Sequence, residues 1–182
     1  MKPANVLILP GWQNSGPGHW QSRWELAHGY TRVEQHDWLR PLRGDWIARL
    51  EEVLMDCDEP AVLVAHSLGC LQTAAWAAHS RNGHRVKAAL LVAPPDIERD
   101  EMRQSLPGWS APSLRALPFK CVLFASSNDP FCTLARSRQF ASAWNADFVA
   151  AGPHGHLNAE SGLGDWPEAY EKLLQLMRVA TA

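Results

Sequence analysis

One serine stands in a context that can make it a nucleophile. Ser67 follows the apolar run 61–65 and His66, and Gly69 lies two residues after it. A buried strand followed by small-x-Ser-x-Gly and a helix is typical of a sharp, strained turn that lifts a serine hydroxyl above a sheet. Ala65 stands where glycine is usual in this pattern. The alternative is a serine that only caps the next helix.

A serine nucleophile needs a base to take its proton, so further groups must come from elsewhere in the chain. After such a turn, an acid and then a histidine follow in loops at the carboxyl ends of later strands. Asp129 comes just after the apolar run 121–125 and is the candidate acid. His154 and His156 lie in a glycine-rich loop before the last predicted helix, and one of them is the candidate base.

Two neighbouring residues are alternatives to these assignments. Asp96 also follows an apolar run, although its place after Pro94 and Pro95 fits a helix N-cap at least as well. His66 adjoins Ser67, so its side chain leaves the backbone in another direction, and we predict a structural role for it.

Backbone amides near Ser67 are the candidate donors for an oxyanion. The residue after the nucleophile supplies one, which is the amide of Leu68. The loop after the first strand supplies the other, where Gly11 permits a tight turn and Trp12 offers its amide, with Gln13 as the alternative.

Aromatic side chains are the candidates for an apolar acyl pocket. Trp12 lies next to the predicted oxyanion donors, Phe131 follows the Asp129–Pro130 turn, and Trp109 belongs to a segment that could overhang the site. Most other tryptophans fall on helical faces and are predicted to be core residues: Trp24, Trp46, Trp76, Trp144 and Trp166.

The elements that position these residues alternate between short apolar runs and stretches of helical period. This alternation predicts an α/β protein with a parallel sheet covered by helices on both faces. The predicted strands are 6–9, 61–65, 86–93 and 121–125, with weaker edge strands at 31–35 and 147–150. Predicted helices cover 45–55 with Asp45 as N-cap, 165–177, a region around 20–27, and the stretch from Ser67 through Ala78. Pairing neighbours gives a six-stranded sheet in the order 2-1-3-4-5-6.

The segment 94–118 departs from this rhythm. It carries five prolines, so a continuous helix is excluded. We expect it to pass over one end of the sheet, with one helix around 97–106. It is too short for a second domain, and we predict a single domain over 1–182.

Composition limits the classes of partner and location. Seventeen basic and 19 acidic residues give a net charge of −2, which favours neither nucleic acid nor an anionic membrane as partner. The start of the chain lacks the features of a secretory signal, and no apolar stretch could span a bilayer. The four cysteines show no metal-ligand or redox spacing, so we expect free thiols in a reducing cytoplasm, without disulfide or metal.

Several motifs together resemble one family. They are Leu9-Pro-Gly-Trp12, Gly16-Pro-Gly-His-Trp20, Ala65-His-Ser-Leu-Gly69, Asn128-Asp-Pro130, Gly155-His-Leu-Asn158 and Ser161-Gly-Leu-Gly-Asp-Trp-Pro167. The chain is similar, nearly end to end, to small bacterial serine hydrolases related to retinoblastoma-binding protein nine. The resemblance implies an α/β-hydrolase fold without a large cap and lacking the first two strands of larger relatives. It also implies Ser67, Asp129 and His156 as triad, and favours His156 over His154.

The expected function is therefore hydrolysis of a small acyl ester through a covalent acyl-enzyme, with no metal or organic cofactor. Two alternatives stay open. One is a serine peptidase or acyltransferase that uses the same triad. The other is a protein-binding module on a hydrolase scaffold, because a fold alone does not confer activity. The sequence names no protein partner and no physiological substrate.

Overall fold

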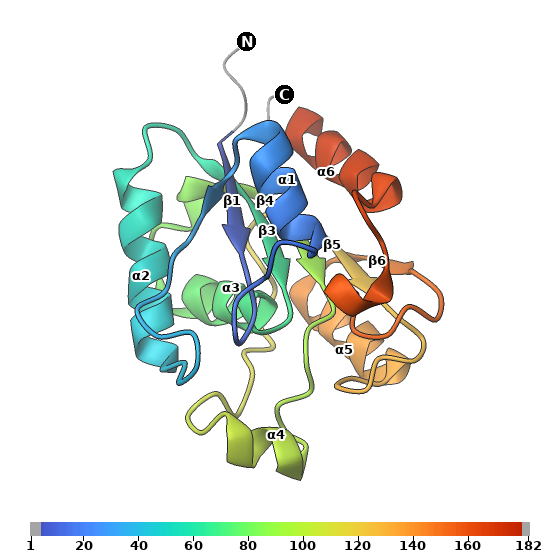
Figure 1. Ribbon diagram of the computed structural model, residues 1–182. Helices are drawn as coiled ribbons and strands as arrows, with labels where there is room; N and C mark the ends of the chain where they lie inside the picture. The colour runs from blue at the N-terminus through green and yellow to red at the C-terminus, as the bar shows by residue number, and fades with distance from the viewer. Residues whose placement is uncertain (1–4, 180–182) are drawn as a thin grey trace.

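The structure, a computed structural model, describes residues 5–179 and contains one six-stranded sheet over that range (Figure 1). The strands are β1 (Val6–Leu9), β2 (Thr31–Arg32), β3 (Ala61–His66), β4 (Val86–Val92), β5 (Lys120–Ala125) and β6 (Asp147–Ala150). They pair in the order β2-β1-β3-β4-β5-β6, and every pair is parallel. The predicted strand order is therefore confirmed. Residues 1–4, where no secretory signal is expected, lie outside the described residues.

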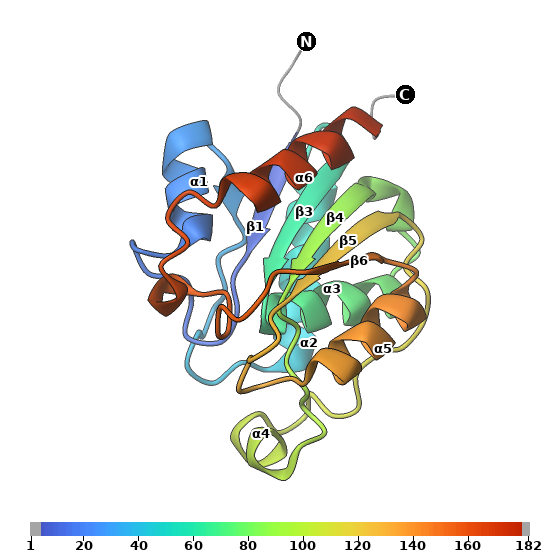
Figure 2. The same ribbon diagram turned by 90° about the vertical axis from the view of Figure 1, so that its right-hand side faces the viewer.

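Helices cover both faces of the sheet (Figure 2). Those of the described chain are α1 (Trp20–His28), α2 (Arg43–Asp56), α3 (Leu68–His79), α4 (Asp100–Ser105), α5 (Leu134–Trp144) and α6 (Pro167–Val179), with short 3-10 turns η1 (Gly83–Arg85) and η2 (Ala159–Ser161). Buried residues of α1 and α6 form one core layer, and those of α2, α3 and α5 form the other. Among the described residues, no helix combines the length and apolar character needed to cross a bilayer.

The central strands are mostly apolar because both of their faces are covered, and their polar residues Lys87, Lys120 and His66 lie at or near strand ends. In β1, Leu7 and Leu9 pack into the layer of α2 and α3, whereas Val6 and Ile8 pack into the layer of α1 and α6. The five tryptophans predicted to be core are all buried, at 5% exposure or less. The edge strands β2 and β6 are the only exposed or half-exposed strands of the described sheet, which explains their weaker apolar signal.

Several boundaries differ from the sequence prediction, and those of β2, α2 and α6 differ by two residues or more. Strand β2 covers only Thr31–Arg32, because the Val33 amide still donates to Ile8 but the next donor along β1 would be Pro10, which has no N–H. Helix α2 begins two residues early, so Asp45 lies in its first turn, where a carboxylate favours the helix dipole, and Leu42 is the N-cap. Helix α6 begins at Pro167 rather than at 165.

The segment 94–118 leaves the layers and carries α4, which lies beyond the carboxyl ends of the strands (Figure 1). Its helix covers Asp100–Ser105, inside the region 97–106 in which one was expected. Residues 5–179 thus add one small excursion at this end of the sheet and no large cap.

The junction of α3 and β1 needs glycine at position 69. A Cβ on Gly69 would lie 2.3 Å from the Leu9 carbonyl oxygen and 3.0 Å from that of Pro10. Because both are backbone atoms, relief requires α3 to move away from β1. Gly69→Ala is expected to lower the free energy of unfolding by about 3 kcal/mol or more, which corresponds to roughly 10 °C in Tm. Thermal and denaturant unfolding would measure the loss.

Gly44→Ala is the matched control for this prediction. Gly44 lies in the first turn of α2, and a Cβ there would meet nothing within 4 Å. Alanine in a helix is expected to stabilise by up to about 1 kcal/mol. A Gly69→Ala protein as stable as the Gly44→Ala protein would contradict the close packing of α3 on β1.

Candidate active site

Ser67 occupies a strained turn between β3 and α3. Strand β3 ends at His66, α3 begins at Leu68, and Ser67 between them has φ 54° and ψ −121°. Non-glycine residues rarely adopt positive φ, and such strain is typical of functional sites. The Ser67 side chain makes no capping hydrogen bond to α3. The simple helix-cap alternative therefore does not account for this serine.

Three side chains from separate parts of the chain meet above the carboxyl ends of the strands. Nε2 of His156 lies 2.9 Å from Oγ of Ser67. Nδ1 of the same ring lies 3.0 and 2.9 Å from the two carboxylate oxygens of Asp129. The side chains of His156 and Asp129 are 11% and 3% exposed. A buried carboxylate thus orients an imidazole toward a hydroxyl that remains accessible.

The loop that carries His156 is tied to the loop that carries Asp129. The amide of His154 donates to Ser126 Oγ at 2.9 Å, and the amide of Gly155 donates to Asn128 Oδ1 at 2.8 Å. Ser126 Oγ also donates to Asn128 Oδ1. The residue pattern alone predicts no role for Ser126 or Asn128, although Asn128 belongs to the Asn-Asp-Pro motif. The side chain of His154 itself is exposed.

Asp96, the alternative acid, has other partners. Its Oδ1 accepts a hydrogen bond from the amide of Glu98 at 3.3 Å and lies 3.5 Å from Nε of Arg136. Its amide donates to the carbonyl of Phe131. The carboxylate that reaches the imidazole of His156 is that of Asp129.

The loop after β1 approaches Ser67 at Gly11. A Cβ on Gly11 would lie 2.7 Å from Cβ of Ser67 and 3.2 Å from its Oγ, so only glycine fits this approach. The amide of Gln13, the alternative donor, is already used by the Trp38 carbonyl at 3.0 Å. Within residues 5–179, no hydrogen bond engages the amide of Trp12. Leu68 is the first residue of α3, where amides have no acceptor inside the helix.

The three candidate pocket residues have different surroundings. The ring of Phe131 lies edge-on to that of His156, with centroids 4.7 Å apart, and Phe131 is 39% exposed. Trp12 is half-buried and donates through Nε1 to the Leu39 carbonyl.

Trp109 is a buried core residue, contrary to the prediction that it could line an acyl pocket. It is 1% exposed, donates through Nε1 to the Pro41 carbonyl at 2.9 Å, and packs edge-on against Trp46. The proline-rich segment inserts this ring into the core.

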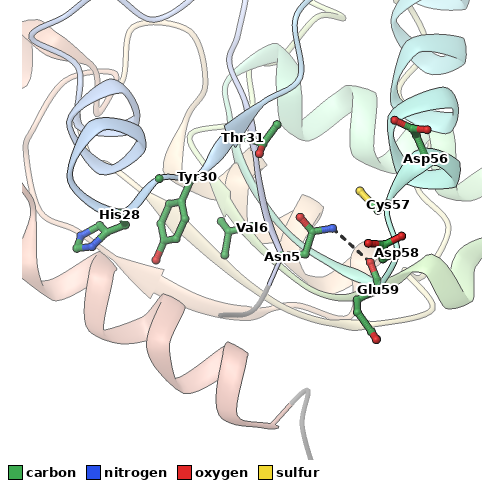
Figure 3. A pocket seen from close by; sticks show the side chains of 10 residues that line it. Asn5, Val6, His28, Tyr30, Thr31, Asp56, Cys57, Asp58 and Glu59 are labelled. Atoms are coloured by element: carbon green, nitrogen blue, oxygen red, sulfur yellow. Dashed lines mark hydrogen bonds between the residues drawn. The ribbon is translucent and has the colours of Figure 1, made fainter. Parts of the chain in front are cut away.

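A cavity of about 450 Å³ lies at the opposite end of the sheet, beside the amino ends of the strands (Figure 3). His28 and Tyr30 line one side, and the acidic turn 56–59 lines the other. Asn5 lies between them and donates to the Glu59 carbonyl at 3.3 Å. None of the three side chains that meet at Ser67 contributes to this cavity, so we do not place the chemistry there.

A family model of serine hydrolases matches residues 6–175 of the chain. The search of curated proteins found no match to this chain. Among solved structures, a YdeN-like hydrolase from Pectobacterium atrosepticum is 27% identical with a TM-score of 0.86, covering 98% of this chain and 93% of that one. The ydeN gene product of B. subtilis is 21% identical with a TM-score of 0.77, covering 97% and 100%. The esterase RhEst1 from Rhodococcus is 14% identical with a TM-score of 0.67, covering 96% and 90%. The last two show likeness of fold alone.

Proposed function

The chain belongs to the serine hydrolase family, and from that premise we propose that it cleaves a small carboxylic ester through a covalent acyl-enzyme on Ser67. The observation that carries the proposal is the continuous contact from the Asp129 carboxylate through the His156 imidazole to the Ser67 hydroxyl. The strained backbone of Ser67 adds support, because non-glycine residues with positive φ cluster at active sites.

Acylation begins when Oγ of Ser67 attacks the ester carbonyl carbon while Nε2 of His156 takes the hydroxyl proton. Asp129 accepts from Nδ1, which fixes the tautomer that leaves Nε2 free and stabilises the imidazolium that forms. The negative charge on the tetrahedral oxygen is received by the amides of Leu68 and Trp12, each worth up to about 10²–10³ in turnover at comparable sites. The imidazolium then protonates the leaving alcohol as the C–O bond breaks.

Deacylation repeats these steps with water as the nucleophile. His156 takes one proton from water, the resulting hydroxide attacks the acyl carbon, and the protonated ring returns the proton to Oγ of Ser67. The products are a carboxylic acid and the regenerated serine, so the cycle needs no further reactant.

Small esters fit the surroundings of Ser67 better than large substrates held under a lid. The described chain adds only the α4 excursion at this end of the sheet, and the ring of Phe131 stays partly exposed beside His156. We propose that Phe131 and Trp12 contact the acyl or aryl group. Among the fold relatives, RhEst1 is described as an esterase. The cytoplasm is the proposed location, and the four free cysteines fit a reducing compartment.

A fluorophosphonate probe tests the proposal directly, because it reacts with serines that an adjacent base has activated. The folded protein is expected to take up one equivalent, and peptide mass spectrometry is expected to locate it on Ser67. Hydrolysis of 4-nitrophenyl esters of increasing acyl length would then test ester cleavage and chain preference. A folded protein that resists the probe would favour the binding-module alternative. Labelling without ester turnover would favour a peptidase or an acyltransferase.

A further inference from the structure

His66, the residue directly before the nucleophile, makes a contact across the site. Its Nε2 lies 2.9 Å from the backbone carbonyl oxygen of His156, which is 90 residues away in the sequence. A carbonyl oxygen only accepts hydrogen bonds, so Nε2 of His66 must carry a proton and donate. The side chain is 5% exposed. The strand end that presents Ser67 thus also grips the backbone of the residue that activates it.

The hydrogen bond from His66 helps to fix the position of His156, because this residue belongs to no helix or strand. The residue lies between β6 and η2, and both of its neighbours have positive φ, Gly155 at 59° and Leu157 at 51°. Its carbonyl is held by His66, and the next carbonyl, that of Leu157, accepts from Nε1 of Trp20 at 2.8 Å. The side chains of His66 and Trp20 therefore hold the backbone from which the His156 imidazole projects.

His66 is itself enclosed by rings. His19 lies edge-on to it with centroids 4.7 Å apart, and the rings of Trp20 and His156 lie 6.2 and 4.9 Å away. Nδ1 of His19 accepts the amide of Gln21, which leaves Nε2 as its protonated nitrogen. That Nε2 is buried and has no hydrogen-bond partner among the residues that the structure describes. The Gly-Pro-Gly-His-Trp segment thus supplies two of the rings that confine His66.

Both buried histidines are held in the neutral form. Burial lowers the pKa of His66 well below its usual value, and the nearby His19 and His156 lower it further. Burial, followed by the charge of Arg32 and by His156, lowers the pKa of His19 to about 3. A neutral donor can hold the His156 carbonyl without placing a second positive charge beside the imidazolium that forms during turnover.

We propose that His66, confined by His19 and Trp20, is a positioning residue that sets the imidazole of His156 against Ser67 by hydrogen-bonding the His156 carbonyl. The inference rests on the proposed function for its kinetic consequence, but not for the hydrogen bond itself. Catalytic geometry is sensitive to displacement of the base, and errors near 1 Å cost about 100-fold in rate. His66 is thereby assigned a role beyond the structural one predicted from the sequence.

Two substitutions of similar size separate the hydrogen bond from packing. Glutamine places its Nε2 the same number of bonds from Cα as histidine does, so His66→Gln keeps a donor, whereas His66→Met fills similar volume without one. His66→Met is expected to lower kcat for a 4-nitrophenyl ester about 30- to 100-fold with KM changed less than about threefold. His66→Gln is expected to restore at least about a third of wild-type kcat. Equal kcat values for the two variants would overturn the proposal.

A measurement without turnover separates this inference from the proposed function. Long-range ¹H–¹⁵N NMR of the histidine rings reports which ring nitrogen carries the proton. His66 is expected to be protonated on Nε2 at neutral pH in the wild-type protein. Protonation on Nδ1 would overturn the proposal even in an active enzyme, because no donor would then face the carbonyl. If the fluorophosphonate probe fails to label folded protein, the hydrolase proposal falls while the NMR result still decides the hydrogen bond.

Discussion

Ser67→Ala is expected to lower kcat for a 4-nitrophenyl ester by about 10⁵-fold, since it removes the atom that forms the acyl-enzyme. KM is expected to change little, because the alanine variant keeps the backbone amides of Leu68 and Trp12 and the surface that contacts the substrate. The residual rate above that of water is expected to come from those amides. Initial rates with active-site-titrated wild-type enzyme as the reference would measure the ratio.

Ser142→Ala is the matched control. Ser142 is exposed on α5, and its alanine variant should keep the wild-type kcat and the wild-type uptake of fluorophosphonate. The Ser67→Ala protein should take up none. A loss of less than about tenfold in kcat on replacing Ser67 would mean that another group, or water itself, attacks the carbonyl.

His156→Ala is expected to lower kcat by a comparable factor, about 10⁴- to 10⁶-fold, because the nucleophile and its base act as a unit. The Ser67 hydroxyl then has no acceptor for its proton at neutral pH. Stopped-flow measurement of nitrophenol release would show whether acylation, rather than deacylation, has slowed. The double variant Ser67→Ala/His156→Ala is expected to have nearly the same kcat as either single variant.

His154→Ala distinguishes the two histidines of this loop. The amide of His154 donates to Ser126 Oγ, and its carbonyl accepts from Ser161 Oγ, so its backbone holds the loop. Alanine keeps both bonds, and the exposed imidazole has no contact with Ser67, so kcat is expected to stay within about threefold of wild type. Equal losses for His154→Ala and His156→Ala would reopen the assignment of the base.

Most of the fold follows from the apolar runs, because central strands of a parallel sheet are apolar on both faces and edge strands are not. The weak runs at 31–35 and 147–150 mark the edges for this reason. Helix boundaries are harder to predict from sequence. Helix α2 begins at Arg43 without a capping side chain, so the prediction of Asp45 as its N-cap is wrong. The apolar pattern does not predict helix α5, because the buried face of this helix includes Ser137, which breaks the apolar period.

Residue types and their order in the chain are enough to predict which side chains form the centre of the site. Ser67, Asp129 and His156 were chosen by motif and position, and the structure brings their side chains together. Trp109 was misassigned, because no local pattern says whether a ring in a proline-rich segment points inward or outward. The contact of His66 with the His156 carbonyl depends on a backbone group, and backbone groups leave no trace in residue identity.

Adjacency in the chain links two of the contacts at this site. His66 and Ser67 are consecutive, so a displacement of the end of β3 moves the Ser67 hydroxyl and the His66 side chain in the same direction. The His66 side chain holds the backbone of His156, so the imidazole is expected to follow. Asp129 follows β5, and β4 lies between β5 and β3 in the sheet. The carboxylate therefore has no such direct link to β3. Sliding between β3 and β5 is therefore expected to change the distance from Asp129 to Nδ1 more than the distance from Oγ to Nε2, within the limit set by the hydrogen bonds between the loops of Asp129 and His156.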